Sequence, residues 1–194
     1  MAKYLDTSVL AKLCEIRKRI YKEREDFYKE FKIDLLDTDT LSSSAIYEIV
    51  CQYDKNYNIN FSRNGEDAIS NGVLVEQKCT RIPGPYTKTG KLRKQAGQDA
   101  CFTFHAHGDI IYPRYIFAAL DKETLTVVRL YDVSNDDLTA KIQSYLLLER
   151  QKYDDRCALD PKHKKRDTIV LPESLLQGFN LTRTVINECL VYKN

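Results

Sequence analysis

The sequence predicts a single domain of the α/β or α+β class, in which helices flank a mixed central β-sheet. The chain has 194 residues, enough for one well-buried core and too few for two ordinary domains. Hydrophobic residues make up 43% and charged residues 30%, values that exclude a disordered or fibrous chain. Helix-like and strand-like patterns follow one another without an internal repeat. We expect N-terminal helices at residues 1–56, a sheet at 57–133, and a helix with a C-terminal tail at 134–194.

The N-terminal part shows the residue spacing of helices. Between residues 7 and 31, apolar side chains recur at intervals of three, four and seven positions, while the opposite face is charged. Either Thr7 or Ser8 can cap the start of this helix. A second, shorter helix is expected after the serines at 42–44, and the polar stretch 53–56 ends it.

From about Tyr57 the spacing of apolar residues becomes that of β-strands. β-Branched and aromatic residues, bounded by turn-forming residues, predict strands at 73–82 and 101–107. In the same way, the segment 114–120 is expected to form a hairpin with 125–132. These strands make up the predicted sheet.

A second helical region follows the predicted sheet. Ser134 is a good capping residue, and the apolar stripe that begins after it extends to about Lys152. The charged stretch 154–167 is expected to be a connector, followed by a short strand at 168–171.

The basic residues are clustered, although the net charge of the chain is only +2. No acidic residue interrupts the sequence from Gln77 to Gln98, and a second basic run follows near position 165. The first cluster is either a contact for DNA phosphates or a solvated loop, and the second is either a contact for DNA phosphates or bases or a solvated charged surface. The residues concerned are Lys88, Lys91, Arg93 and Lys94 in the first cluster, and Lys164, Lys165 and Arg166 in the second.

The sequence shows neither an apolar run long enough for a membrane span nor the layout of a signal peptide. We therefore expect a cytoplasmic protein with no membrane partner. Its six cysteines are scattered singly without a CxxC pair, which argues against a zinc site and against a disulfide framework. They are expected to be reduced and mostly buried.

Two carboxylates and a lysine stand close together in the predicted strand region. Glu76 and Lys78 are two positions apart, so they point to the same face of a strand. Asp67 precedes a turn at 70–72, which would return the chain antiparallel and bring Asp67 near Glu76. Such a trio suits phosphodiester hydrolysis assisted by Mg²⁺, with the carboxylates as metal ligands and the lysine beside the attacked phosphate.

The acid-x-Lys pattern is weak by itself, because it occurs three times in this chain. The copy at 30–32 lies on a charged helix and the copy at 160–162 in a loop, so only the copy at 76–78 lies on an apolar strand. The alternative interpretation of this copy is a surface-facing strand whose Glu76 and Lys78 form an ordinary ion pair.

Two segments resemble those of a known enzyme family. The segment RNGEDAISNGVLVEQK at 63–78 resembles the catalytic segment of the PvuII-like type II restriction endonucleases, which belong to the PD-(D/E)xK nuclease superfamily. The segment FTFHAH at 102–107 is similar to the histidine-rich recognition segment of that family. The likeness extends over roughly residues 63–153 in the same order and implies a restriction-endonuclease-like core.

The resemblance assigns roles to particular residues. It implies Asp67 and Glu76 as metal ligands and Lys78 as the catalytic lysine, with one or two Mg²⁺ ions in each active site. It also implies His107, and less surely His105, as side chains that contact bases in the major groove. The function implied is cleavage of both strands of double-stranded DNA at a short, palindromic site. Cutting a palindrome with one site per chain asks for a homodimer, for which the apolar stripe of the first helix is the predicted interface.

The sequence also departs from that family in its recognition segments. Ala106 stands where the family has a third consecutive histidine, and the region 164–167 is basic where the family has paired asparagines. Three other functions therefore stay open. They are another PD-(D/E)xK nuclease, acting in repair or junction resolution, a non-catalytic DNA-binding module, and a small-ligand domain in which Glu76 and Lys78 only pair.

Overall fold

The computed structural model describes residues 7–34, 37–60, 66–82, 99–122, 124–160, 162 and 167–194. The chain divides into two compact units, residues 1–41 and residues 42–194, which are described one by one. The division falls inside helix α2, well before the end of the expected helical region at residue 56.

Helix α1, Thr7–Phe31, makes up most of the first unit and confirms the predicted N-terminal helix. Its last turns are fastened to the following residues, since Arg24 Nε donates a hydrogen bond to Asp34 Oδ1 at 2.7 Å. Several of its apolar side chains are exposed within this unit, among them Leu13, Ile16 and Ile20. These three residues lie on one face, because they are three and four positions apart.

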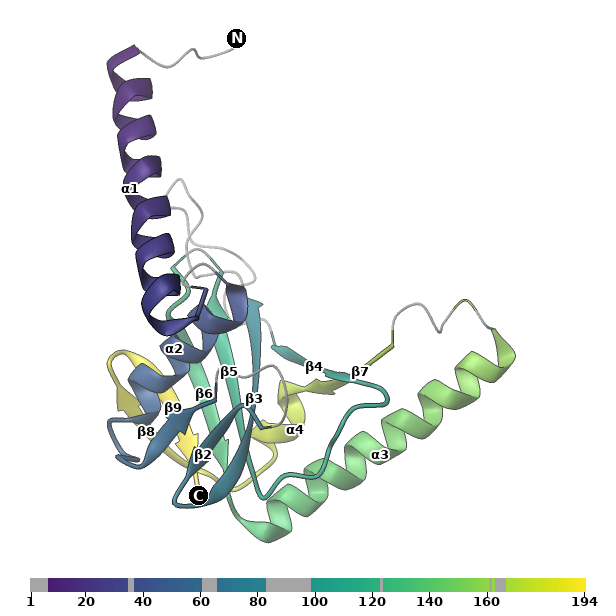
Figure 1. Cartoon of the computed structure of the whole chain (residues 1–194). Coiled ribbons are helices and arrows are strands. Elements are labelled where there is room, and N and C mark those ends of the chain that lie inside the picture. The colour runs from purple at the N-terminus through teal and green to yellow at the C-terminus, as the bar shows by residue number, and fades with distance from the viewer. Residues whose placement is uncertain are drawn as a thin grey trace. The chain divides into compact units, whose positions relative to one another are not determined.

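The second unit is built on a seven-stranded mixed sheet flanked by helices, which confirms the predicted fold class (Figure 1). The strand order is β1-β2-β3-β5-β6-β9-β8. The pairs β3–β5 and β6–β9 are parallel, and the other neighbours are antiparallel. The strands are β1 Tyr57–Ile59, β2 Ala68–Ser70, β3 Val73–Ile82, β5 Arg114–Asp121, β6 Val127–Val133, β8 Thr182–Ile186 and β9 Cys189–Lys193.

A second, two-stranded sheet pairs β4, Cys101–His105, with β7, Thr168–Pro172. The remaining helices are α2 Thr38–Val50, α3 Asp136–Leu159 and the short α4 Glu173–Gln177. Helix α2 starts four residues earlier than the predicted serines, because the Asp37 carboxylate accepts a hydrogen bond from the Asp39 backbone and opens the helix there.

Strand β5 lies at the centre of the core, and all eight of its residues are buried. Successive side chains alternate between the two faces of the sheet. On one face, Tyr115 and Phe117 pack in a cluster that includes α3, α4, β4 and β7. On the other face, Ile116 and Ala118 pack against Ile46 and other residues of α2. Continuous burial on both faces is what fixes β5 as the middle of the sheet.

The hairpin of β2 and β3 confirms the predicted turn. Ala68 pairs with Val75 and Ser70 with Val73 in an antiparallel ladder. Asn71 and Gly72 both have positive φ, of 50° and 81°, as a two-residue type I′ turn requires. An Asn-Gly sequence adopts this turn at low cost, so it sets the register of the residues that follow.

Helix α3 is longer than the sequence predicts. It continues to Leu159 rather than ending near Lys152, because Tyr153 and Cys157 extend its buried stripe. The predicted connector at 154–167 is therefore wrong over its first part. The N-cap is Asn135 and not Ser134, since the Asn135 side chain accepts hydrogen bonds from the backbone N–H groups of residues 137 and 138.

The C-terminal region also differs from the expected tail, because β8 and β9 complete the main sheet. The fully buried Glu173, at the start of α4, ties this region to the core. Its carboxylate accepts hydrogen bonds from Arg129 Nε at 2.6 Å, from Tyr131 Oη at 2.8 Å and from the Ala100 backbone at 2.6 Å. Three donors around one carboxylate offset the cost of burying its charge.

All six cysteines are free, but only Cys157 and Cys189 are buried, so the prediction of mostly buried thiols is wrong. Within the ranges that the structure describes, no helix has the length and apolar character needed to cross a membrane.

Candidate active site

The structure brings Asp67, Glu76 and Lys78 together beside the β2–β3 hairpin. Asp67 directly precedes β2, and its Oδ2 accepts a hydrogen bond of 2.7 Å from the Gln77 backbone. The carboxyl group of Asp67 is close enough to that of Glu76 to raise the pKa of Glu76. Lys78 Nζ lies 2.5 Å from Glu76 Oε1. The hairpin register accounts for this convergence, since it places residue 67 beside the middle of β3.

Glu76 and Lys78 point to the same face of β3, as the sequence predicts. Their parallel partners on β5 are Tyr115 and Phe117, whose side chains belong to the core cluster beneath α3. Only 8% of the Glu76 side chain is exposed, and 25% of the Lys78 side chain. The Lys78 ammonium lies 5.3 Å from the centre of the Phe104 ring. This burial contradicts the surface-facing alternative, because an ordinary surface ion pair leaves both groups in water.

The buried position changes the protonation of Glu76. Burial raises the pKa of its carboxyl group from 4.5 to about 7, with the Lys78 charge opposing and the Asp67 charge adding to the rise. Near neutral pH the Glu76 carboxyl is therefore partly protonated. A cation placed between Asp67 and Glu76 would favour the ionised form of both groups, so the pair has the electrostatic character of a cation site.

Tyr112 and Asp109 were missed by the sequence analysis. Burial raises the pKa of the Tyr112 phenol to about 12, and the charges of Glu76, Asp109, Asp67 and Glu66 contribute. The phenol therefore lies close enough to these carboxylates for their charges to act on it. No spacing pattern marks Tyr112, because it stands in the irregular segment between β4 and β5. Only the folded chain places it beside the hairpin.

The donor set fits Mg²⁺ better than a transition metal. Among the described residues, no group of three or more His, Cys, Asp and Glu side chains is arranged to hold a metal ion. Asp67 and Glu76 supply carboxylate oxygens from two residues. Mg²⁺ is usually held by one or two carboxylates, with water and substrate phosphate completing its ligands. A structural zinc site, in contrast, needs four protein ligands.

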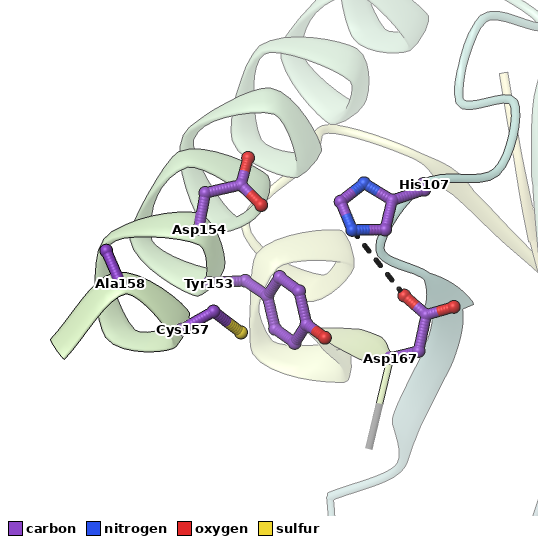
Figure 2. A pocket seen from close by; sticks show the side chains of 6 residues that line it. All are labelled: His107, Tyr153, Asp154, Cys157, Ala158 and Asp167. Atoms are coloured by element: carbon purple, nitrogen blue, oxygen red, sulfur yellow. Dashed lines mark ion pairs between the residues drawn. The ribbon is translucent and has the colours of Figure 1, made fainter. Parts of the chain in front are cut away.

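The two candidate recognition histidines do not lie on one strand, so the predicted strand at 101–107 is too long by two residues. Strand β4 ends at His105, where the chain turns because the Gly108 backbone donates to the His105 carbonyl at 3.2 Å. His105 is exposed and pairs with Thr168 of β7. His107 lies within this turn, and its Nε2 is 3.9 Å from Asp167 Oδ1 (Figure 2).

His107 faces a pocket of about 570 Å³ beside the last turns of α3 (Figure 2). The ring of Tyr153 meets the His107 ring edge-on, with 5.8 Å between the ring centres. Asp154 and Asp167 add carboxylates to the lining, which Cys157 and Ala158 complete. The described part of this pocket thus offers hydrogen-bond acceptors and an imidazole.

The predicted phosphate-contacting residues lie outside the described residues. These are Lys88, Lys91, Arg93 and Lys94 of the first basic cluster and Lys164, Lys165 and Arg166 of the second. Their role stays a prediction from the sequence.

The site thus combines a carboxylate pair with a lysine on a mixed α+β sheet. No protein-family model matches this chain, and no curated protein matches it significantly.

Proposed function

We propose that this chain is a Mg²⁺-dependent endonuclease of the type II restriction class, which hydrolyses phosphodiester bonds in both strands of a short DNA site. The observation that carries the proposal is the convergence of Asp67 and Lys78 on the buried Glu76. Two carboxylates next to one ammonium group, on the face of a central strand, provide what phosphodiester hydrolysis requires. The resemblance of segments 63–78 and 102–107 to restriction endonucleases adds to this support.

In this proposal Asp67 and Glu76 would hold Mg²⁺, and the bound ion would supply charge neutralisation at the phosphate and a more acidic water molecule. The ion pair with Glu76 keeps the Lys78 ammonium on the substrate side of the strand. Lys78 orients the attacking water and stabilises the negative charge that develops on the phosphate oxygens. Water adds to phosphorus as the bond to the 3′ oxygen breaks, so the products carry a 5′-phosphate and a 3′-hydroxyl group.

The proposal includes a homodimer, because one active site in each chain cuts only one strand at a time. Two copies related by the two-fold axis of a palindrome place one site at each strand. The exposed apolar stripe of α1 supports its role as the interface. Mixing chains labelled with two different dyes and measuring energy transfer tests this role. Replacing Ile16 and Ile20 by Glu should abolish the signal.

Cleavage of a long plasmid of mixed sequence tests the function directly. We expect discrete fragments with Mg²⁺ and intact plasmid without it. Asp67→Asn should abolish cleavage, because it removes a charge from the metal site while keeping the size of the side chain. Asp155→Asn, at an exposed position of α3, is the matched control and should cut like the wild type.

Each of the other possible results would indicate a different class of protein. Cleavage of branched DNA irrespective of sequence would indicate a repair or junction nuclease of the same superfamily. Binding of DNA without cleavage under any divalent cation would indicate a DNA-binding module, and the proposal would then be wrong. A protein that neither binds nor cuts DNA would contradict both.

A further inference from the structure

The turn that carries His107 is fastened to α3 by a single guanidinium group. Arg150 Nε donates a hydrogen bond to the carbonyl oxygen of Ala106, and Arg150 Nη2 donates to the carbonyl oxygen of Gly108. These two carbonyl groups flank His107 in the sequence. The planar guanidinium holds its N–H groups at fixed angles, so both hydrogen bonds constrain the backbone on either side of the histidine.

Further contacts define the same turn. The Ala106 backbone donates to the Asp167 carbonyl at 3.1 Å, which joins the turn to the start of β7. Gly108 is tightly enclosed, because a Cβ added there would lie 3.1 Å from the Cβ of His105. The His107 side chain itself is 62% exposed, although its backbone is held on both sides. A rigid backbone that presents an exposed imidazole is suited to recognition of a ligand outside the molecule.

We propose that Arg150 is a positioning residue for target recognition, which fixes the orientation in which His107 meets the edge of a DNA base. This inference rests on the proposed function. Arg150 acts through the backbone of Ala106 and Gly108 rather than by touching DNA. Its role is therefore distinct from that of basic residues that neutralise phosphates.

The proposal predicts how a conservative change should act. In Arg150→Lys the positive charge stays, but one ammonium group cannot reproduce the planar pair of hydrogen bonds. We expect His107 to lose its fixed orientation. The preference for the principal cleavage sites over secondary sites should fall at least about fivefold, the lower end of what one specific base contact provides. Arg156→Lys, on the exposed side of the same helix, is the matched control and should retain the preference.

The test compares plasmid fragments from the wild type, Arg150→Lys, His107→Asn and the double variant. Both single variants should add secondary fragments. The double variant should resemble His107→Asn, because the two residues act as one unit. NMR spectra of the labelled imidazole groups should show the His107 signal moving in Arg150→Lys and staying in place in Arg156→Lys. The chain has only 3 histidines, so the His107 signal is assigned by its loss in His107→Asn.

The outcomes separate this inference from the function on which it rests. If the wild type cuts at discrete sites and Arg150→Lys gives the same fragments at the same rates, the positioning role is wrong and the proposed function stands. Additive losses in the double variant would also overturn it, since they would indicate a general structural role. If the wild type leaves the plasmid intact with every divalent cation, both fail, whatever the NMR signal shows.

Discussion

Replacing Glu76 by Gln should stabilise the protein at alkaline pH while destroying its proposed activity. Gln keeps the size of the side chain and an oxygen that accepts a hydrogen bond from Lys78, but it cannot ionise. In the wild type, burial holds the pKa of Glu76 at about 7, above the value of 4.5 for an unperturbed carboxyl. The folded protein therefore keeps a proton that the unfolded chain releases between pH 4.5 and pH 7.

The size of the effect follows from these two values. Because the folded state binds more protons across that window, stability falls as the pH rises through it. Each pH unit corresponds to about 1.4 kcal/mol, so ionisation of Glu76 costs at most about 3 kcal/mol once the pH is above 7. Glu76→Gln avoids that cost. The variant should match the wild type near pH 4.5 and exceed its free energy of unfolding by up to about 3 kcal/mol at pH 8.

Urea unfolding at several pH values measures this difference. Far-ultraviolet circular dichroism is the suitable signal, because the chain has no tryptophan. Titrating groups away from the site are shared by the two proteins, so the difference between them reports Glu76 together with the neighbours on which its charge acts. Glu48→Gln, at an exposed position of α2, is the control and should show no such pH dependence. A constant difference between Glu76→Gln and the wild type from pH 4.5 to pH 8 would refute the reasoning.

Three further predictions concern the hairpin, the C-terminal anchor and the basic cluster. Gly72→Ala should lower the free energy of unfolding by about 1 kcal/mol in urea titrations, because φ is 81° at this position, and a zero effect would contradict the turn geometry. Glu173→Gln should cost about 3 kcal/mol near neutral pH, since it weakens a buried ion pair. The pKa of Glu173 is lowered in spite of its burial, chiefly by the Arg129 guanidinium. The cost of the substitution should therefore vanish as the pH falls through the pKa of Glu173 in the folded protein. A cost that persists in acid would contradict this explanation. Neutral substitutions in the first basic cluster should make DNA binding less sensitive to salt. The slope of the logarithm of the binding constant against the logarithm of the salt concentration should fall by about 0.9 for each phosphate that the protein no longer neutralises. An unchanged slope would show that the cluster does not touch phosphate. The residues to replace are Lys88, Lys91, Arg93 and Lys94.

The convergence of Asp67, Glu76 and Lys78 was predictable from the sequence because its geometry is local. An Asn-Gly turn fixes the hairpin, and the two-residue period of a strand puts Glu76 and Lys78 on one face. Strand β3 accordingly has the bounds that the sequence predicts. The depth of burial was not predictable, since it depends on β5 and on the cover provided by β4 and α3.

The missed features depend on contacts between distant parts of the chain. Tyr112 shortly precedes β5, which lies parallel to β3 and so brings the phenol within range of the carboxylate charges, and no local pattern encodes that pairing. Helix α3 continues past Lys152 because Tyr153 and Cys157 find a partner surface, although the neighbouring residues are charged. The end of β4 at His105 depends on a turn that is held from α3 through Arg150.

The late position of the β8–β9 hairpin in the chain affects how the protein folds and aggregates. Strand β6 is buried at five of its seven positions. It pairs with β5 along one edge and with β9 along the other. Until residues 189–193 have been synthesised, a growing chain therefore carries an apolar strand with unpaired backbone groups. Such an edge recruits other strands, including those of neighbouring nascent chains. Protein truncated before β8 should accumulate in inclusion bodies, even though all residues of the candidate active site are present in it.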